Sequence, residues 1–263
     1  MAFEYVIVER KDHLTILTLN RPERMNALHP PAHVELDGII QDFIDDDEQW
    51  VMIITGAGEK AFSAGNDLRY QAEHGSAALR DGMKGVVGGF AGITKRTDIT
   101  KPIIAAVNGF ALGGGFEIVL SCDIIIAADT AKMGLPEPRV GLAAAAGGMH
   151  RLPRHIPYHQ AMGMMLTARH VSAEEGKQLG FVNEVVPSSE LMATAEKWAA
   201  QIMECSPLSI RATKQTAQQG LDMTLEDALS SVSPAHKAMM QSEDFVEGPL
   251  AFSEKRKPNW KGR

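Results

Sequence analysis

The chain has 263 residues, 44% of them hydrophobic and 22% charged, which fits one large domain or a domain with an appendage and excludes a disordered or collagen-like protein. Its 33 acidic and 26 basic residues give a formal net charge of -7, so a general nucleic-acid-binding protein, which needs a basic surface, is not expected. The two cysteines, Cys122 and Cys205, are far apart and lack a C-x-x-C spacing, which indicates a reduced protein without a disulfide framework or a metal centre.

The first ten residues have the alternating pattern of a strand rather than that of a targeting segment. They contain no basic region followed by an apolar run. No apolar run in the chain reaches the ~18 uncharged residues that a membrane-spanning helix needs. We therefore expect a cytoplasmic protein that does not bind a membrane, although a processed organellar protein would fit the same pattern.

Three short apolar runs in the first half of the chain predict strands that are buried on both faces. They are Leu14–Leu19, residues 51–55 and Ile103–Val107, and each is followed by Gly, Pro or Asn residues. Between the first two runs, residues 33–45 carry apolar side chains at a helical spacing. The order strand, helix, strand favours a layered α/β fold.

The pattern becomes predominantly helical after about Pro187. A helix from near Gly115 toward Cys122 and a strand at Ile124–Ala128 precede this change. Helices are then predicted over residues 191–204, from Pro207 onward and from Thr224 to about Met240. Ser206 and Thr224 are the expected N-caps, and Pro234 should kink or restart the last helix. We therefore divide the chain into a core, residues 1–190, and a helical subdomain, residues 191–263.

Two short motifs resemble known ligand-binding turns but lack the required context. Residues 56–61 match the G-x-G-x-x-A pattern of a dinucleotide-binding turn, yet the following Phe-Ser-Ala-Gly-Asn stretch excludes the helix that such a turn must enter. Residues 62–65 match half of a nucleophile elbow, without its first glycine. We therefore do not expect Ser63 to be a nucleophile. A loop of small residues that lets a ligand reach backbone N–H groups is the better interpretation.

The glycine-rich stretch 108–117 is the strongest candidate site. Three glycines at a helix start permit close approach of a ligand to free N–H groups. Glu117 follows them in an apolar segment, and Glu137 comes 20 residues later. Two carboxyl groups in apolar surroundings can acquire separated pKa values and act as an acid and a base. The alternative is that Glu117 only favours the helix start and that Glu137 is an ordinary turn residue.

Several segments, in order along the chain, resemble the signature of the crotonase (enoyl-CoA hydratase/isomerase) superfamily. The strongest are residues 61–68, 101–117 and 133–137, and residues 20–28, 179–182 and 247–256 also fit. The resemblance covers essentially the whole chain. It implies an α/β fold built as a spiral of ββα turns, with a helical C-terminal subdomain that forms homotrimers or hexamers made of two trimers.

The resemblance also implies which residues bind and transform an acyl-CoA thioester. The thioester oxygen would accept hydrogen bonds from the backbone N–H groups of Ala64 and Gly114, which would stabilise an enolate. Glu117 would activate a water molecule, and Glu137 would exchange a proton with the α-carbon. The residues expected to contact the substrate are Arg24, Met25, Ala27, Ala64, Gly65, Asn66, Asp67, Leu68, Gly113 and Gly114, with Phe252 and Lys255 reaching the nucleotide of a neighbouring subunit. Asp67 is also expected to cap a helix.

The expected activity is hydration of a 2-enoyl-CoA to a 3-hydroxyacyl-CoA, or the reverse dehydration. No cofactor is expected beyond the coenzyme A that belongs to the substrate, and no metal. The alternatives are a carnitinyl-CoA dehydratase or another acyl-CoA isomerase or lyase of the superfamily. A non-catalytic or RNA-binding homologue is disfavoured by the acidic charge and by the presence of both carboxylates. The chain departs from the superfamily pattern at residues 142–148, where four alanines replace the usual proline and glycine, so the identity of the acyl group stays open.

Overall fold

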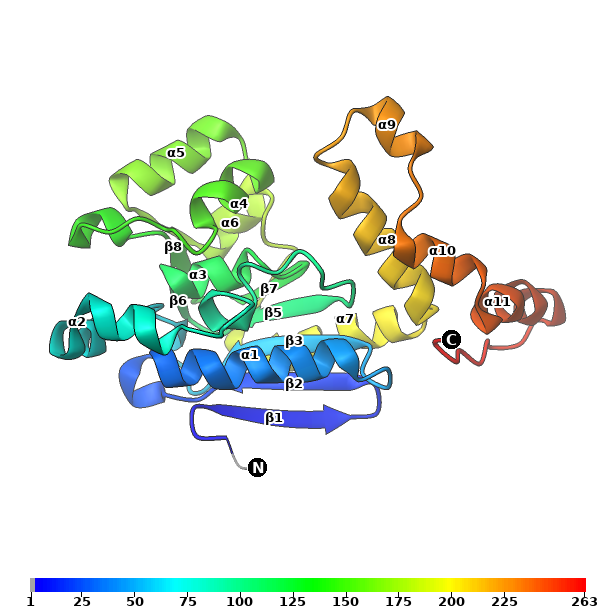
Figure 1. The fold of residues 1–263 in the computed structure, drawn as a ribbon, viewed down its shortest axis with the longest axis horizontal. Coiled ribbons are helices and arrows are strands. Elements are labelled where there is room, and N and C mark those ends of the chain that lie inside the picture. The colour runs from blue at the N-terminus through cyan, green and yellow to red at the C-terminus, as the bar shows by residue number, and fades with distance from the viewer. Residues whose placement is uncertain (1–2) are drawn as a thin grey trace.

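Two sheets form the centre of the molecule in a computed structural model that describes residues 3–263 (Figure 1). The larger sheet has the strand order β1-β2-β3-β5-β7-β10, and the smaller has the order β4-β6-β8-β9. Neighbouring strands are parallel except in the pairs β1–β2 and β8–β9. The larger sheet comprises Val6–Lys11, Leu14–Leu19, Val51–Gly56, Ile103–Val107, Ile124–Ala128 and Glu184–Val186, and the smaller comprises Ala61–Ser63, Phe110–Leu112, Lys132–Gly134 and His170–Ser172.

Strands of the two sheets alternate along the chain, which produces the predicted repeat of two strands and a helix. β3, β5 and β7 are each followed by a short strand of the smaller sheet, namely β4, β6 and β8. Helix α2 (Leu68–Gly82) follows β4, and α3 (Gly114–Val119) follows β6. β8 leads through the 3-10 helix η3 (Glu137–Val140) to α4 (Gly148–His155). The loops at the ends of the short strands therefore lie next to one another in successive repeats.

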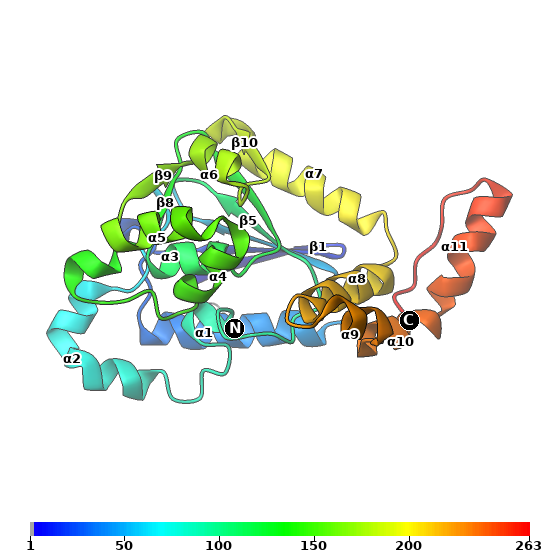
Figure 2. The same ribbon diagram turned by 90° about the horizontal axis from the view of Figure 1, so that it is seen from above.

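Helices cover both faces of the larger sheet. Seen from above, α1 (Pro30–Asp45) lies on one side of the sheet and α7 (Leu191–Met203) on the other (Figure 2). Every residue of β3 and of β5 is buried, because both of their faces are covered. The predicted strands Leu14–Leu19 and Ile103–Val107 are confirmed, and β3 extends one residue further, to Gly56. α1 starts at Pro30, three residues earlier than predicted, because proline suits the first helical turn.

The last four helices leave the core and extend to one side (Figure 1). They are α8 (Pro207–Gly220), α9 (Leu225–Ser230), α10 (Pro234–Met240) and α11 (Glu243–Glu254). The predicted caps are confirmed, since the side chains of Ser206 and Thr224 accept N–H groups of α8 and α9. Pro234 restarts the chain as α10 with Ser233 as its cap. The remaining elements are η1 (Pro22–Arg24), η2 (Phe90–Gly92), α5 (Tyr158–Thr167), α6 (Ala173–Leu179) and η4 (Ser188–Glu190).

The division between residues 190 and 191 stays a prediction. α7 follows this point but packs against the larger sheet, and its residues Leu191, Ala195 and Ala199 belong to the main core. The helices that project from the core are those from α8 onward.

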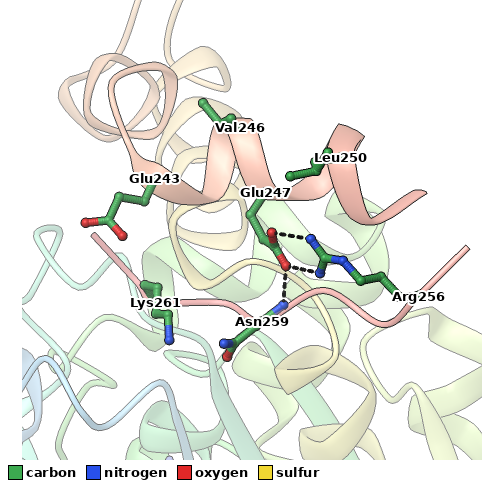
Figure 3. Close-up of a pocket in the computed structure, with 7 residues that line it drawn as sticks. All are labelled: Glu243, Val246, Glu247, Leu250, Arg256, Asn259 and Lys261. Carbon is green, nitrogen blue, oxygen red and sulfur yellow. Dashed lines mark hydrogen bonds and ion pairs between the residues drawn. The ribbon is translucent and has the colours of Figure 1, made fainter. Parts of the chain in front are cut away.

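The C-terminal tail folds back along α11 (Figure 3). Glu247 accepts the Arg256 guanidinium, with a distance of 2.8 Å from Nη2 to Oε2, and the N–H of Asn259 at 2.7 Å. These hydrogen bonds hold the tail against α11 although they are exposed to solvent. Large apolar side chains on and between α8 to α11 stay exposed, among them Leu221, Leu225, Leu229, Val246 and Phe252. No helix within residues 3–263 is long and apolar enough to cross a membrane, and the first two residues of the predicted N-terminal strand lie outside the described part.

Candidate active site

Glu117 lies in the first turn of α3, which follows strand β6 of the smaller sheet. Its side chain is buried, with 3% exposed, and its Oε1 accepts the N–H of Gly148 at 2.8 Å. Burial raises the pKa of Glu117 to about 7, although the N–H of Gly148 acts to lower it. When Glu137 is ionised, its negative charge adds to the rise. Glu117 is therefore a carboxyl group that gains and loses its proton near neutral pH.

Glu137 begins η3, directly after Leu135 and Pro136, and lies beside the start of α3. Its Oε1 is 3.1 Å from the position that a Cβ on Gly113 would occupy. Its Oε2 is buried and has no hydrogen-bond partner in the described part of the chain. Burial raises the pKa of Glu137 as well. The structure thus brings the two predicted carboxyl groups together in a site with little solvent, where one of them has a backbone donor and the other has an orphaned oxygen.

The prediction that Ala64 supplies a free N–H group is wrong. Its N–H donates to the carbonyl of Met25 at 2.9 Å. Leu28 and Asn66 form an isolated parallel bridge, in which the N–H of Leu28 donates to Gly65 and that of Asp67 donates to Leu28. A parallel bridge uses alternate residues of a strand, so the N–H of Asn66 is left without an acceptor within residues 3–263.

The N–H of Gly114 is the second unpaired donor at this place. It stands at the first position of α3, where no intrahelical acceptor exists, and no other acceptor is found within the described residues. A Cβ on Gly65 would lie 2.7 Å from the Gly114 nitrogen, so the loop that carries Asn66 touches the start of α3. Asn66 and Gly114 therefore form a pair of neighbouring backbone donors that is available to a ligand.

Close packing explains the run of glycines at the start of α3. A Cβ on Gly115 would lie 2.1 Å from the carbonyl oxygen of Ser63, and a Cβ on Gly114 would lie 2.5 Å from Cζ of Phe90. Gly113 has φ +56, a conformation that side chains disfavour. Ser63 itself is buried, and its hydroxyl donates to the carbonyl of Asn26 at 2.8 Å.

The predicted substrate-binding loop at residues 24–27 is tied to the loop before β4. The amide of Asn26 donates to the carbonyls of Ala57, at 3.0 Å, and Ala61, at 2.7 Å. Between the two loops lies a groove of about 300 Å³. Its lining consists of Pro22, Met25, Asn26, Ala57, Gly58, Glu59, Lys60 and Ala61. The sequence analysis did not single out Lys60, which gives this groove a cation.

Asp67 is the predicted helix cap. Its carboxylate accepts the N–H groups of Arg69 and Tyr70 at the start of α2 and pairs with Arg21 at 3.1 Å. With only 7% of the residue exposed, these partners occupy the side chain. Leu68, the first residue of α2, is exposed.

Phe252 lies in the last turn of α11, and Lys255 follows the end of this helix. α11 extends away from α3, the helix that carries Glu117 (Figure 2). Phe252 is 87% exposed, and Lys255 ends the helix with φ +53. Their expected contact with the nucleotide of a neighbouring subunit stays a prediction.

An apolar hollow of about 330 Å³ adjoins the site and includes the loop at which the sequence departs from the superfamily pattern. It is lined by Leu135, Pro138, Ala143, Ala144, Met149, Met162, Met165 and Leu166. A Cβ on Gly148 would lie 3.0 Å from both Leu135 and Ala144, and 3.1 Å from Cγ of Glu117. The hollow therefore lies beside the buried carboxyl group, and none of its lining side chains is charged.

Comparison with known proteins agrees with this arrangement. The model of the enoyl-CoA hydratase/isomerase family matches residues 9–263. A carnitinyl-CoA dehydratase from Escherichia coli (strain K12) is 42% identical over 264 residues, which cover 99% of each chain. The crystal structure of an enoyl-CoA hydratase from Bacillus anthracis has a TM-score of 0.92 and 34% identity, and covers 99% of this chain and 100% of that chain. One from Mycobacterium tuberculosis H37Rv has a TM-score of 0.90 and 34% identity, and covers 98% and 99%.

The structural matches include both sheets and the projecting helices, so the predicted crotonase-type fold is confirmed. The family match also covers every segment on which the resemblance was based. This protein therefore belongs to the enoyl-CoA hydratase/isomerase, or crotonase, family.

Proposed function

We propose that this crotonase-family enzyme is a hydro-lyase that adds water to the double bond of a 2-enoyl-CoA, or removes it from the 3-hydroxyacyl-CoA. The observation that carries this proposal is the pair of buried Glu117 and half-buried Glu137 beside two backbone N–H groups that have no acceptor within residues 3–263. An enzyme that retains both carboxyl groups can manage both protons of the reaction.

The two backbone donors would bind the thioester oxygen. As water adds at C3, negative charge moves onto this oxygen, and the N–H groups of Asn66 and Gly114 stabilise the resulting enolate. Because these donors are part of the folded backbone, they require no reorganisation during the reaction. The unpaired state of both N–H groups supports this role.

The two glutamates would divide the proton transfers. Ionised Glu117 accepts a proton from the water, whose hydroxyl forms the new bond to C3, and protonated Glu137 delivers a proton to C2 of the enolate. Addition thus leaves Glu117 protonated and Glu137 ionised, and one proton must return from Glu117 to Glu137 before the next cycle. A pKa of about 7 suits a base at neutral pH.

Coenzyme A would occupy the groove between the loop that carries Met25 and the one that carries Lys60. A protein with a net charge of -7 needs local cations for this anionic group, and Lys60 and Arg24 are placed on these loops. Phe252 and Lys255 would complete the nucleotide site of a neighbouring copy. Exposed apolar side chains on α8 to α11 support a homotrimer or hexamer, which the mass of the particle in solution would test.

Carnitinyl-CoA dehydration is the second candidate, because the relative of that name is 42% identical over the whole chain. The uncharged lining of the hollow beside Glu117 favours an apolar acyl group instead. The two candidate functions therefore differ in the acyl group of the substrate, and both would use the same glutamates and backbone donors.

A panel of thioesters tests both proposals. Crotonyl-CoA, longer straight-chain 2-enoyl-CoAs and carnitinyl-type thioesters would be compared by the change in enoyl absorbance and ranked by kcat/KM. We expect straight-chain substrates to rank first. A ranking led by the carnitinyl type would favour the second candidate. Absence of turnover with every member, together with salt-sensitive RNA binding, would overturn the assignment as a hydro-lyase.

A further inference from the structure

Two side chains of α1, Asp37 and His33, accept hydrogen bonds from the backbone of the segment that contains η2. Oδ1 of Asp37 accepts the N–H of Gly88 at 2.8 Å, and its Oδ2 accepts the N–H of Val87 at 3.0 Å. Nδ1 of His33 accepts the N–H of Ala91 at 3.0 Å. Because His33 and Asp37 are four residues apart in α1, they present their acceptors on the same face of the helix.

The backbone at this place is in a conformation that ordinary residues avoid. Gly89 has φ +74, Gly92 has φ +68, and Ala91, which has a side chain, has φ +54. A left-handed alanine persists only where the surrounding structure holds it. The hydrogen bond from the N–H of Ala91 to His33 is such a restraint, and it is buried.

This strained turn places the ring of Phe90 over the start of α3. Cζ of Phe90 is 2.5 Å from the position that a Cβ on Gly114 would occupy, and Cε1 is 2.6 Å from it. The ring of His33 packs against that of Phe90, with centroids 4.4 Å apart at an angle of 59°. His33 thus contacts the aromatic ring as well as the N–H of the residue after it.

His33 is suited to act as a permanent acceptor. It is 3% exposed, and burial lowers its pKa to about 4, with a smaller effect from the charge of His29. At neutral pH the imidazole is uncharged. Its Nδ1 accepts a hydrogen bond from the N–H of Ala91, so the ring carries its own proton on Nε2.

We propose that Phe90 is the wall of the acyl site next to the thioester and limits substitution at the α-carbon, and that His33 is the positioning residue that holds this wall. The inference rests on the proposed function, because it places the thioester oxygen at the N–H of Gly114. The α-carbon is bonded to the thioester carbonyl carbon. A ring in contact with Gly114 therefore restricts a branch at that carbon more than it restricts the distant end of the acyl chain.

The first test compares crotonyl-CoA with its 2-methyl-substituted analogue in the wild type and in Phe90→Leu and Phe90→Ala. Both variants remove ring atoms above Gly114, so the ratio of kcat/KM for the branched over the unbranched substrate should rise on the order of tenfold. An unchanged ratio in both variants would show that Phe90 does not limit the α-carbon.

The second test separates the hydrogen-bond acceptor of His33 from its ring. His33→Phe keeps a ring of similar size but has no acceptor for Ala91, whereas His33→Gln keeps an acceptor. We expect His33→Phe to raise the branched-to-unbranched ratio in the same direction as Phe90→Leu, and His33→Gln to restore part of the wild-type ratio. The double variant His33→Phe/Phe90→Leu should shift the ratio less than the product of the two single shifts.

A matched control excludes a general loss of stability. Phe43→Leu removes atoms from a fully buried side chain on the same helix, about 15 Å further along its axis by the helical rise. It should lower Tm but leave the ratio unchanged. If Phe43→Leu and His33→Phe shift the ratio equally, the positioning role of His33 is wrong.

A last measurement needs no substrate and therefore separates this proposal from the proposed function. Gly114→Ala should lower Tm because the new methyl group meets the ring of Phe90. The same substitution in a Phe90→Ala background should lower Tm much less. If this coupling appears but the wild-type protein converts no enoyl-CoA, the contact between Phe90 and Gly114 is supported and the proposed function is wrong. If the coupling is absent, the contact on which the wall depends is refuted.

Discussion

α3 and η3 each contribute one glutamate to the same site, but the surroundings of the two side chains differ. Glu117 belongs to a wholly buried helix and has a backbone donor from Gly148. Glu137 belongs to a mostly exposed turn, and its Oε2 has no donor within residues 3–263. The same side chain therefore experiences two environments. Such an inequality allows one carboxyl group to act as a base while the other acts as an acid.

The largest expected effect comes from removing the acid on η3. Glu137→Gln should lower kcat by about 10²–10⁴ with little change in KM, because the side chain transfers a proton without anchoring the thioester. Its Oε2 has no hydrogen-bond partner to lose among the described residues, so Tm should change little. Steady-state kinetics and a thermal melt check both statements, and a kcat within threefold of the wild type would contradict the role of Glu137.

The second largest expected effect comes from removing the backbone N–H of Asn66, which lies next to the start of α3. Asn66→Pro removes the N–H of residue 66 and should lower kcat by about 10²–10³, the usual cost of one oxyanion donor. Asn66→Ala is the matched control, because it keeps the N–H and loses only the amide bond to Gln71. Equal kinetics in the two variants, with equal Tm, would mean that the N–H of Asn66 does not contact the reacting oxygen.

These two residues also show what the sequence can predict and where it stops. Glu137 was found from its neighbours in the chain and its distance from Glu117, and the strand Ile103–Val107 from a local run of apolar residues. The resemblance points to Ala64 and not to Asn66 as the donor, because the choice depends on a bridge to Leu28, which is distant in the sequence. The ring of Phe90 above Gly114 was missed for the same reason, since no local pattern records a contact between two loops.

The pH dependence of stability tests the burial of Glu117. Between its ordinary pKa of 4.5 and about 7, the folded chain keeps a proton that the unfolded chain has lost. The contribution of Glu117 to stability is therefore fully present below 4.5 and is lost as the pH rises to about 7, by roughly 3 kcal/mol for a difference of this size. Glu117→Gln cannot lose this proton, so its free energy of unfolding should fall less over the same range. Denaturant titrations between pH 5 and 8 are the measurement, and parallel curves for the two proteins would contradict a raised pKa.

The smallest expected effect is a loss of stability on replacing Gly141 at the end of η3, which can be compared with the loss on replacing Gly115 in α3. Gly141 ends η3 with φ +73, but apart from its own chain neighbours no atom of residues 3–263 lies within 4 Å of the position where its Cβ would stand. Gly141→Ala should thus cost only the strain of a left-handed alanine, about 1 kcal/mol, and leave kcat unchanged. Gly115→Ala should cost more, because its Cβ would meet the carbonyl of Ser63 and separate the loop of Asn66 from α3. Gly115 is not among the glycines with a positive φ, so only contact can require it. Equal losses of Tm would therefore contradict the close contact with Ser63, and the tight packing between the two donor loops would no longer explain the glycine-rich start of α3.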